Sequence, residues 1–195
     1  MPSLSTGSFA GNLIALGLSD LAQRLSRLAV VVVVARHLQA DAIGMAAAAL
    51  AAADILKALT ENWVNQRVIA AAPEELEAAC VTGHRIQRAW CCGLFALQLG
   101  IGAAIWAIGG NMQTFVMAGL LAVEYLFMPA GLMSCALAMR EGRLRQTAAI
   151  GGAQVVFANL ATAVLALTMG GPLALIVPRV IAAPVWLIGM RRLRP

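Results

Sequence analysis

Charged residues are scarce in this sequence of 195 residues. Asp, Glu, Lys and Arg together make up 12% of the chain, whereas hydrophobic residues make up 61%, and the mean hydropathy is +0.83. A soluble globule of this size needs more polar surface than so few charges can supply. The composition therefore excludes an ordinary soluble domain and predicts a protein whose solvent is the lipid bilayer.

The patterns that signal metal binding or catalysis are also missing. The four cysteines lie in or beside apolar segments without metal-ligand spacing, so we interpret them as small apolar residues. Both histidines, His37 and His84, fall in connections, and no serine stands in a Gly-x-Ser-Gly-like turn. A paired-aspartate metal motif and a phosphate-cradling glycine loop are absent as well. The sequence therefore predicts a protein that is not an enzyme and needs no metal or cofactor.

Six apolar segments follow one another along the chain, at residues 9–35, 42–64, 89–108, 114–139, 147–169 and 173–190. Each is long enough to cross the roughly 30 Å hydrocarbon core as a helix, which satisfies its own backbone hydrogen bonds in lipid. The sequence thus predicts an all-α polytopic membrane protein, with six transmembrane helices in one bundle and a single membrane domain over residues 1–195. Residues 66–88 are predicted to form a cytoplasmic linker containing a surface helix that starts at Pro73.

Nearly all the basic residues of the connections fall on one side of the predicted zigzag, and the net charge is +5. They lie after the second, fourth and sixth segments, at Arg67, Arg85, Arg88, Arg140, Arg143, Arg145, Arg191, Arg192 and Arg194. The alternate connections, 109–113 and 170–172, carry no charge, and Arg36 is the exception to the pattern. By the positive-inside rule, both termini are predicted to be cytoplasmic, which agrees with six crossings of the inner membrane. We interpret these clusters as topology signals and expect no binding of nucleic acid.

Two of the predicted spans carry polar stripes, which are expensive in lipid and point to function. The stripes, at helical spacing, are Asp20, Gln23, Arg24 and Arg27 in the first span and Asp54, Lys57, Glu61 and Asn65 in the second. If the two helices form an antiparallel hairpin, residues at equal depth can meet. We then expect Arg24 to pair with Asp54 and Asp20 with Lys57, and Arg27 and Glu61 to have no partner at equal depth.

Two further charges lie inside predicted spans. Glu124, in segment 114–139, and Arg179, in segment 173–190, lie at similar depths and are predicted to pair loosely. Glu124 could alternatively act as a proton-coupling acid. Prolines lie in the same two segments, at Pro129, Pro178 and Pro184, and are predicted to bend them. Such bends occur where transporters hinge, and also in inert bundles.

The intramembrane charges allow two interpretations. In the first, they form a buried ladder of ion pairs that fixes helix register. In the second, they line a hydrated, net cationic cavity that holds an anionic head group, and an unpaired Arg27 favours this one. The acidic residues and Lys57 would then balance charge or couple transport.

Three stretches together resemble a family of membrane exporters. They are ARHLQADAIG at residues 35–44, the connection at 65–79 with its Gln-Arg and Pro-Glu-Glu-Leu, and AMREGRLRQTAAI at 138–150, followed by Leu-Ala-Leu at 165–167, Gly-Gly-Pro-Leu-Ala-Leu at 170–175 and Pro-Arg at 178–179. In this order they resemble the polysaccharide biosynthesis and O-antigen flippase branch of the multidrug, oligosaccharidyl-lipid and polysaccharide exporter superfamily.

The resemblance implies a transporter that moves lipid-linked oligosaccharides across the cytoplasmic membrane by alternating access, with a cationic cavity for the diphosphate. Carried onto this chain, Arg24, Arg27 and Arg179 would line that cavity. Such exporters have twelve or more spans in two lobes, whereas this chain resembles the N-terminal lobe alone. We therefore expect a truncated relative or a half-size protein that pairs with a second copy or another lobe. The alternative is a non-transporting interaction or scaffold subunit, or a degenerate fragment of such an exporter.

Overall fold

Helices form every regular element of the computed structural model, which describes residues 6–58 and 63–193. The predicted all-α class is therefore confirmed for this part of the chain. In chain order, the elements are α1 (Thr6–His37), α2 (Ala40–Ala58), α3 (Trp63–Ala70), the 3-10 turn η1 (Pro73–Glu75), α4 (Leu76–Ala107), α5 (Met112–Ala122), α6 (Glu124–Arg140), α7 (Leu144–Met169) and α8 (Leu173–Arg192).

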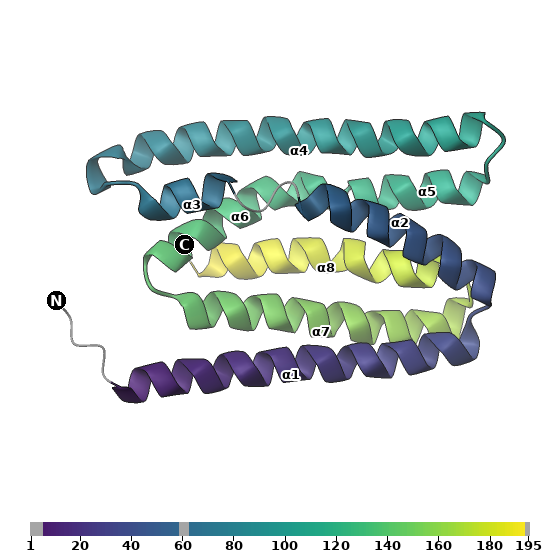
Figure 1. Cartoon of the computed structure of the whole chain (residues 1–195), viewed down its shortest axis with the longest axis horizontal. Helices are drawn as coiled ribbons and strands as arrows, with labels where there is room; N and C mark the ends of the chain where they lie inside the picture. Colours follow the sequence, from purple (N-terminus) through teal and green to yellow (C-terminus); the bar gives the residue numbers. More distant parts are fainter. Residues whose placement is uncertain (1–5, 59–62, 194–195) are drawn as a thin grey trace.

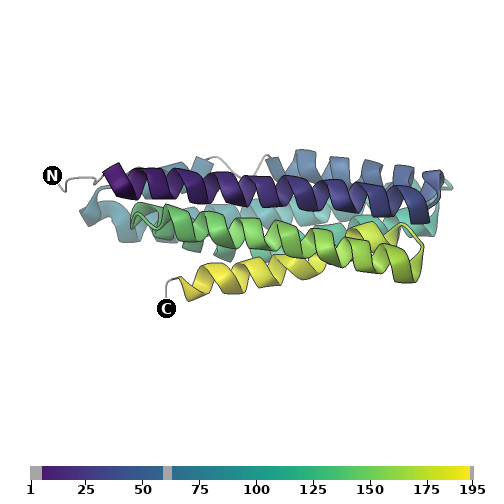
Figure 2. The ribbon, with the colours of Figure 1, turned by 90° about the horizontal axis from the view of Figure 1, so that it is seen from below.

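The long helices lie side by side in one elongated bundle (Figure 1). α1 packs along α7, α7 along α8, and α8 against α6, while α4 packs on α5 and α6. α2 lies obliquely across α5 and α8. Seen from below, α1 and α2 lie on one side of the bundle and α8 lies on the other (Figure 2). The start of α1 and the end of α8 are at the same end of the bundle (Figure 1).

Four helical stretches in the described part of the chain are long and apolar enough to cross a bilayer: Pro73–Ala107, Met112–Arg140, Leu144–Met169 and Leu173–Arg192. They correspond to the third to sixth predicted segments and indicate a membrane-embedded protein. The first two segments do form helices, but these helices carry more charged residues. α1 carries Asp20, Arg24 and Arg27 inside its apolar stretch, and α2 carries Asp54 and Lys57 in its last turns.

Two predicted boundaries change in the structure. The second segment, predicted to run to residue 64, ends as α2 at Ala58, and α3 begins at Trp63. Glu61 lies between them, outside the described residues. The predicted linker 66–88 is largely helical, because α4 begins at Leu76 and continues without a break into the third apolar segment. The proline and acids of η1 provide the helix start that the sequence predicted.

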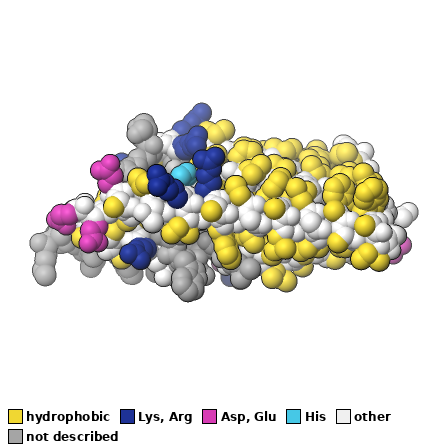
Figure 3. All heavy atoms as spheres, turned by 90° about the horizontal axis from the view of Figure 1, so that it is seen from above, with side chains coloured by type: hydrophobic (Ala, Val, Ile, Leu, Met, Phe, Trp, Pro, Cys, Tyr) yellow, Lys and Arg dark blue, Asp and Glu magenta, His cyan; other side chains and the backbone are white. Residues whose placement is uncertain are grey.

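Polarity changes along the length of α4. From the α4 side, Lys and Arg side chains gather in a band near one end of the bundle, and hydrophobic side chains cover the surface beyond it (Figure 3). On α4 itself, Arg85 and Arg88 are exposed, Trp90 follows them, and exposed apolar side chains continue to Ile105. Tryptophan and arginine are typical of the membrane–water interface. We therefore place the edge of the hydrocarbon region near Trp90.

An arginine from α6 closes the end of α3. Arg140 donates through Nη1 to the carbonyl oxygens of Val68 at 3.2 Å, Ile69 at 3.0 Å and Ala71 at 2.5 Å. The last carbonyls of a helix have no partner within it, and a cation there also complements the helix dipole. Arg140, which the sequence suggested only as a topology signal, therefore fixes α3 to α6.

Replacing Arg140 with alanine is expected to loosen α3, because three carbonyls lose their donor. Loss of a charged donor costs about 2 kcal/mol. Hydrogen exchange in detergent micelles should show faster exchange of the α3 amides, whereas Arg145→Ala, an exposed arginine at the start of α7, should leave them unchanged. Equal exchange in both variants would show that Arg140 does not hold α3.

Candidate functional site

The fourth predicted span tightens near its middle, between α5 and α6. The two helices meet at Val123, whose N–H donates to the Leu120 carbonyl and whose own carbonyl accepts from Leu126. These i→i−3 bonds are those of a tighter, 3-10-like turn. Pro129, within the next two turns, lacks an N–H and deprives the preceding turn of a helical bond. The interruption places Glu124 at the first position of α6, whereas α8 continues through both of its prolines.

Four charged side chains from α2, α6 and α8 form one connected group, which we name the charge cluster: Asp54, Lys57, Glu124 and Arg179. Glu124 accepts from Lys57 Nζ at 2.6 Å through Oε1 and from Arg179 Nε at 3.0 Å through Oε2. Arg179 Nη2 also donates to Asp54 Oδ1. The Glu124 side chain is 7% exposed and that of Asp54 is 61% exposed, so the charge cluster runs from the interior of the bundle to its surface.

The charges of the cluster balance, because two carboxylates face two cations. Both oxygens of Glu124 have a cationic partner, as a carboxylate buried this deeply requires. Lys57 lies in the last turn of α2 and Glu124 in the first turn of α6, so each charge also complements the dipole of its helix. Tyr125 donates its hydroxyl to the Ala53 carbonyl at 3.2 Å, which joins α6 to the turn of α2 that precedes Asp54.

A cavity of about 170 Å³ adjoins the charge cluster. Lys57, Glu124 and Gln154 contribute polar atoms to its wall, and Trp186 is among the apolar residues that complete it. This volume is enough for several water molecules, and the three polar side chains offer them hydrogen-bond partners. The charge cluster therefore has polar space beside it within the bundle.

The ion pairs predicted between the first two spans are wrong. Lys57 pairs with Glu124 and Asp54 with Arg179, and Asp20 pairs with Arg24, one turn along the same helix, at 2.9 Å. The predicted pair of Glu124 with Arg179 is confirmed.

The first two helices separate after their connection at residues 38–39. α1 continues along α7, whereas α2 turns across α5 and α8 (Figure 1). The alanine face of α2 explains its path, because Ala46 and Ala53 are buried against Met117, Leu121 and Ile176. Small side chains allow this close approach. The predicted hairpin therefore gives way to packing of α2 on the later helices.

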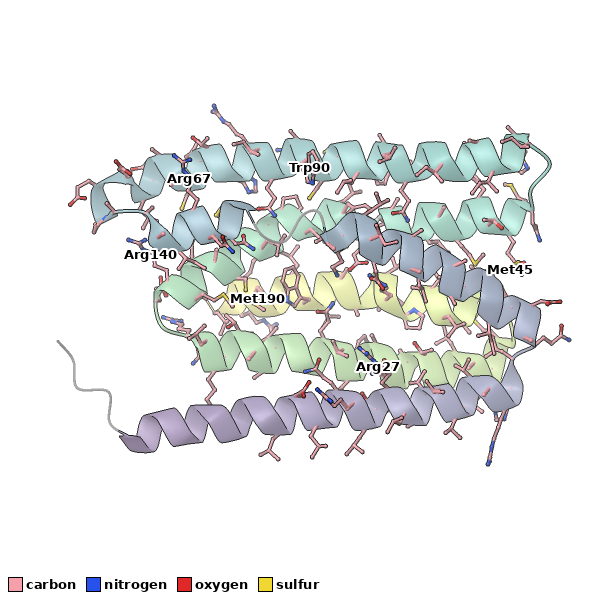
Figure 4. All side chains as sticks on the ribbon, viewed as in Figure 1. Arg27, Met45, Arg67, Trp90, Arg140 and Met190 are labelled. Atoms are coloured by element: carbon pink, nitrogen blue, oxygen red, sulfur yellow. The ribbon has the colours of Figure 1, made fainter. Side chains whose placement is uncertain are left out.

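The polar stripe of α1 forms a separate surface. Asp20 and Arg24 pair with each other while both are largely exposed. Arg27 is exposed and forms no ion pair within residues 6–58 and 63–193. Its side chain extends from α1 over α7 (Figure 4). Asn159 of α7 donates to Ser26 Oγ at 2.7 Å, which ties this side of α1 to the bundle.

The predicted site residues thus divide into two groups. Asp54, Lys57, Glu124 and Arg179 meet in the charge cluster, whereas Asp20, Arg24 and Arg27 lie on α1, and Glu61 falls outside the described residues. Of the cavity wall, sequence reasoning named only Lys57 and Glu124, and it missed the other residues, Gln154 and Trp186 among them. Gln154 gave a usable signal, because it is a polar residue in the middle of an apolar segment. Trp186 gave none.

No family model matches this chain, and neither a curated protein nor a solved structure is significantly similar to it. We therefore infer function from the geometry of the charge cluster and the α1 stripe, together with the motif resemblance in the sequence.

Proposed function

We propose that this chain is a half-transporter, or one lobe of a transporter, that moves an anionic lipid-linked oligosaccharide or polysaccharide precursor across the cytoplasmic membrane by alternating access. The observation that most supports this proposal is the charge cluster, which centres on the buried Glu124 where α2 ends and the α5–α6 span is interrupted. Ionisable groups within a membrane domain usually mark the path of a substrate or coupling ion. Interrupted helices at bilayer depth are typical of transporter sites.

In this proposal α1 and α2 also cross the membrane, which makes six crossings with both termini in the cytoplasm. The 32 residues of α1 extend about 48 Å, more than the roughly 30 Å hydrocarbon core. The start of α7, which follows Arg143, and the end of α8, which carries Arg191, lie at the end of the bundle where α1 starts (Figure 1). This shared position agrees with the positive-inside rule. The polar stripe of α1 would then face protein or water, because lipid penalises it.

Arg27 is the residue that we assign to the anionic head group. Arg24 already pairs with Asp20, and Arg179 already pairs with two carboxylates. Arg27, exposed and without an ion pair in the described chain, can offer its full charge to a phosphate. A guanidinium is well suited to this, because its planar donors bind phosphate oxygens in pairs.

Glu124 is the residue that we assign to coupling. With Glu124 ionised, the charge cluster has no net charge and gives an anion little attraction. Protonation of Glu124 would raise its net charge to +1 and release Lys57 and Arg179 from their shared carboxylate. Binding of the anionic substrate would then favour uptake of a proton, and loss of the proton would favour release. A second copy of the chain, or a separate lobe, would complete the substrate pathway.

The alternative function is a membrane interaction or scaffold subunit that transports nothing. One observation favours it: the charge cluster is internally neutral and joins three helices, as a structural ion-pair network does. Buried ion pairs of this kind can fix helix register without further function.

Replacing Arg27 with glutamine separates these two functions. We expect export of the cell-surface glycan to fall by about tenfold or more, the effect of losing one charge-assisted contact. The amount of protein in the membrane should not change, because Arg27 is exposed. The readout is export per unit of membrane protein. The control is Arg36→Gln, in the last turn of the same helix. Normal export from the Arg27 variant, or a parallel loss of protein, would contradict the transport assignment.

A further inference from the structure

The surface side of Glu124 is closed to a proton by an arginine. Arg179 lies between Glu124 and the exposed Asp54 and donates a hydrogen bond to each of these carboxylates. A guanidinium stays protonated in proteins and accepts no hydrogen bond, so it cannot pass a proton from one neighbour to the next. A proton taken up by Asp54 at the surface therefore has no direct route through Arg179 to Glu124.

The other titratable neighbours of Glu124 do not offer a route either. Tyr125, next to it on α6, donates its hydroxyl to the Ala53 carbonyl at 3.2 Å. Cys91 of α4 is buried in the same core group as Tyr125. Lys57 lies 2.6 Å from Glu124, but its ammonium donates hydrogen bonds and accepts none. Within residues 6–58 and 63–193, the route that remains is the cavity beside the charge cluster.

This cavity of about 170 Å³ extends from the charge cluster toward one end of the bundle. Its residues on α6 follow Glu124 in the chain, and its residues on α8 follow Arg179: they are Phe127, Met128, Leu132, Ala183 and Trp186. Both helices run toward the end of the bundle where α1 starts (Figure 1). In the proposed topology this is the cytoplasmic end, so the cavity lies on the cytoplasmic side of Glu124.

Gln154 of α7 brings a side-chain amide into the wall of this cavity. The amide forms no hydrogen bond with another residue in the described part of the chain. Because an amide both donates and accepts hydrogen bonds, water in the cavity can satisfy it. Each carboxylate oxygen of Glu124 has two lone pairs and one cationic partner, so it can also accept from water. Water can therefore bridge Gln154 and Glu124.

We propose that Gln154 is a positioning residue, which holds the water through which Glu124 gains and loses its proton. A water molecule bonded to the Gln154 amide gives one proton to a Glu124 oxygen and takes one from the next water, so only a proton is transferred. Asp54 has no part in this path, although it is the more exposed carboxylate. The role of Gln154 rests on the proposed function, in which Glu124 carries the coupling proton.

Infrared spectroscopy of the full chain in lipid vesicles tests this path, because a protonated carboxyl and a carboxylate absorb at different frequencies. The signal that is missing from Glu124→Gln belongs to Glu124, and its growth after a jump to acidic pH gives the rate of protonation. We expect Gln154→Leu to slow this rate about tenfold, the effect of losing one hydrogen bond along the path. Thr162→Val, on the same helix but outside the cavity wall, should keep the rate. Asp54→Asn should keep it as well.

A further variant tests the water without removing a polar group, and it remains informative if Gln154→Leu does not fold. Ala183→Val enlarges a buried side chain in the cavity wall, so it should displace water and slow protonation too. Unchanged protonation in either variant would overturn the proposal, and so would an equal slowing by Asp54→Asn. Slower protonation with unchanged export would instead support the path through Gln154 and contradict the coupling role of Glu124. A Glu124 that takes up no proton at any pH at which the bundle stays folded would overturn both.

Discussion

Replacement of Glu124 by glutamine is expected to destabilise the folded bundle by about 3 kcal/mol or more, the effect of removing one partner from a buried ion pair. Glutamine has nearly the same shape, but its neutral amide cannot balance Lys57 and Arg179. Both cations would lose the Glu124 carboxylate, and Arg179 would keep its contact with Asp54. Unfolding in mixed micelles of SDS and a mild detergent would measure the change in the free energy of unfolding.

Asp54→Asn is the matched control, because it removes the other carboxylate of the charge cluster. The Asp54 side chain is 61% exposed, so its loss should cost less than about 1 kcal/mol. Adding Lys57→Met to Glu124→Gln should recover part of the lost stability, since it removes one of the two cations that lose the Glu124 carboxylate. Equal destabilisation by Glu124→Gln and Asp54→Asn would show that burial does not strengthen the interactions of Glu124.

Glu124→Gln also tests the proposed coupling of transport to a proton, because glutamine resembles a protonated glutamate. If protonation of Glu124 favours anion binding, Glu124→Gln should retain substrate affinity while losing net transport, since the cycle needs the proton to leave. In the scaffold alternative, only stability changes. The charge cluster is thus both a structural connection between α2, α6 and α8 and the feature by which the two functions can be distinguished.

Apolar length and charge depth predict part of this structure from the sequence. Long apolar segments predicted the helices that can span a bilayer, and counting residues from the connections predicted that Glu124 and Arg179 meet. Depth alone does not say which helices are neighbours. Equal depth therefore predicted that Asp54 and Lys57 pair with residues of α1, although they contact Arg179 of α8 and Glu124 of α6.

The position of α2 was decided by packing, which the charges do not reveal. Ala46 and Ala53 are buried on α5 and α8, and this contact carries the polar end of α2 away from α1. Asp20 and Arg24, left together on one helix face, then pair with each other at i, i+4, a local contact that helix periodicity could have suggested. A stripe of alanines predicts close approach of helices, but it does not identify the partner helix.

Gly131→Ala is expected to destabilise the bundle by about 1–3 kcal/mol, the usual cost of overpacking a well-packed core. A Cβ atom at position 131 of α6 would lie 2.1 Å from Cζ3 of Trp186 and 2.8 Å from two other atoms of the same ring. The indole packs against a core group that includes Tyr125 and Leu132, so it can relieve the clash only by moving toward the cavity. Displacing it would also reshape the cavity beside Lys57 and Glu124, which the indole helps to enclose.

A helix interior ordinarily favours alanine over glycine by up to about 1 kcal/mol. A loss of stability in Gly131→Ala would therefore indicate the clash with Trp186. Gly151→Ala in α7 is the control, because its Cβ would meet nothing within 4 Å, and we expect it to be neutral or stabilising. Trp186→Leu in the Gly131→Ala background should relieve the clash and recover part of the loss, measured by unfolding in SDS-containing micelles. If the two alanine variants are equally stable, Trp186 does not pack closely on Gly131, and α8 would not supply that wall of the cavity beside the charge cluster.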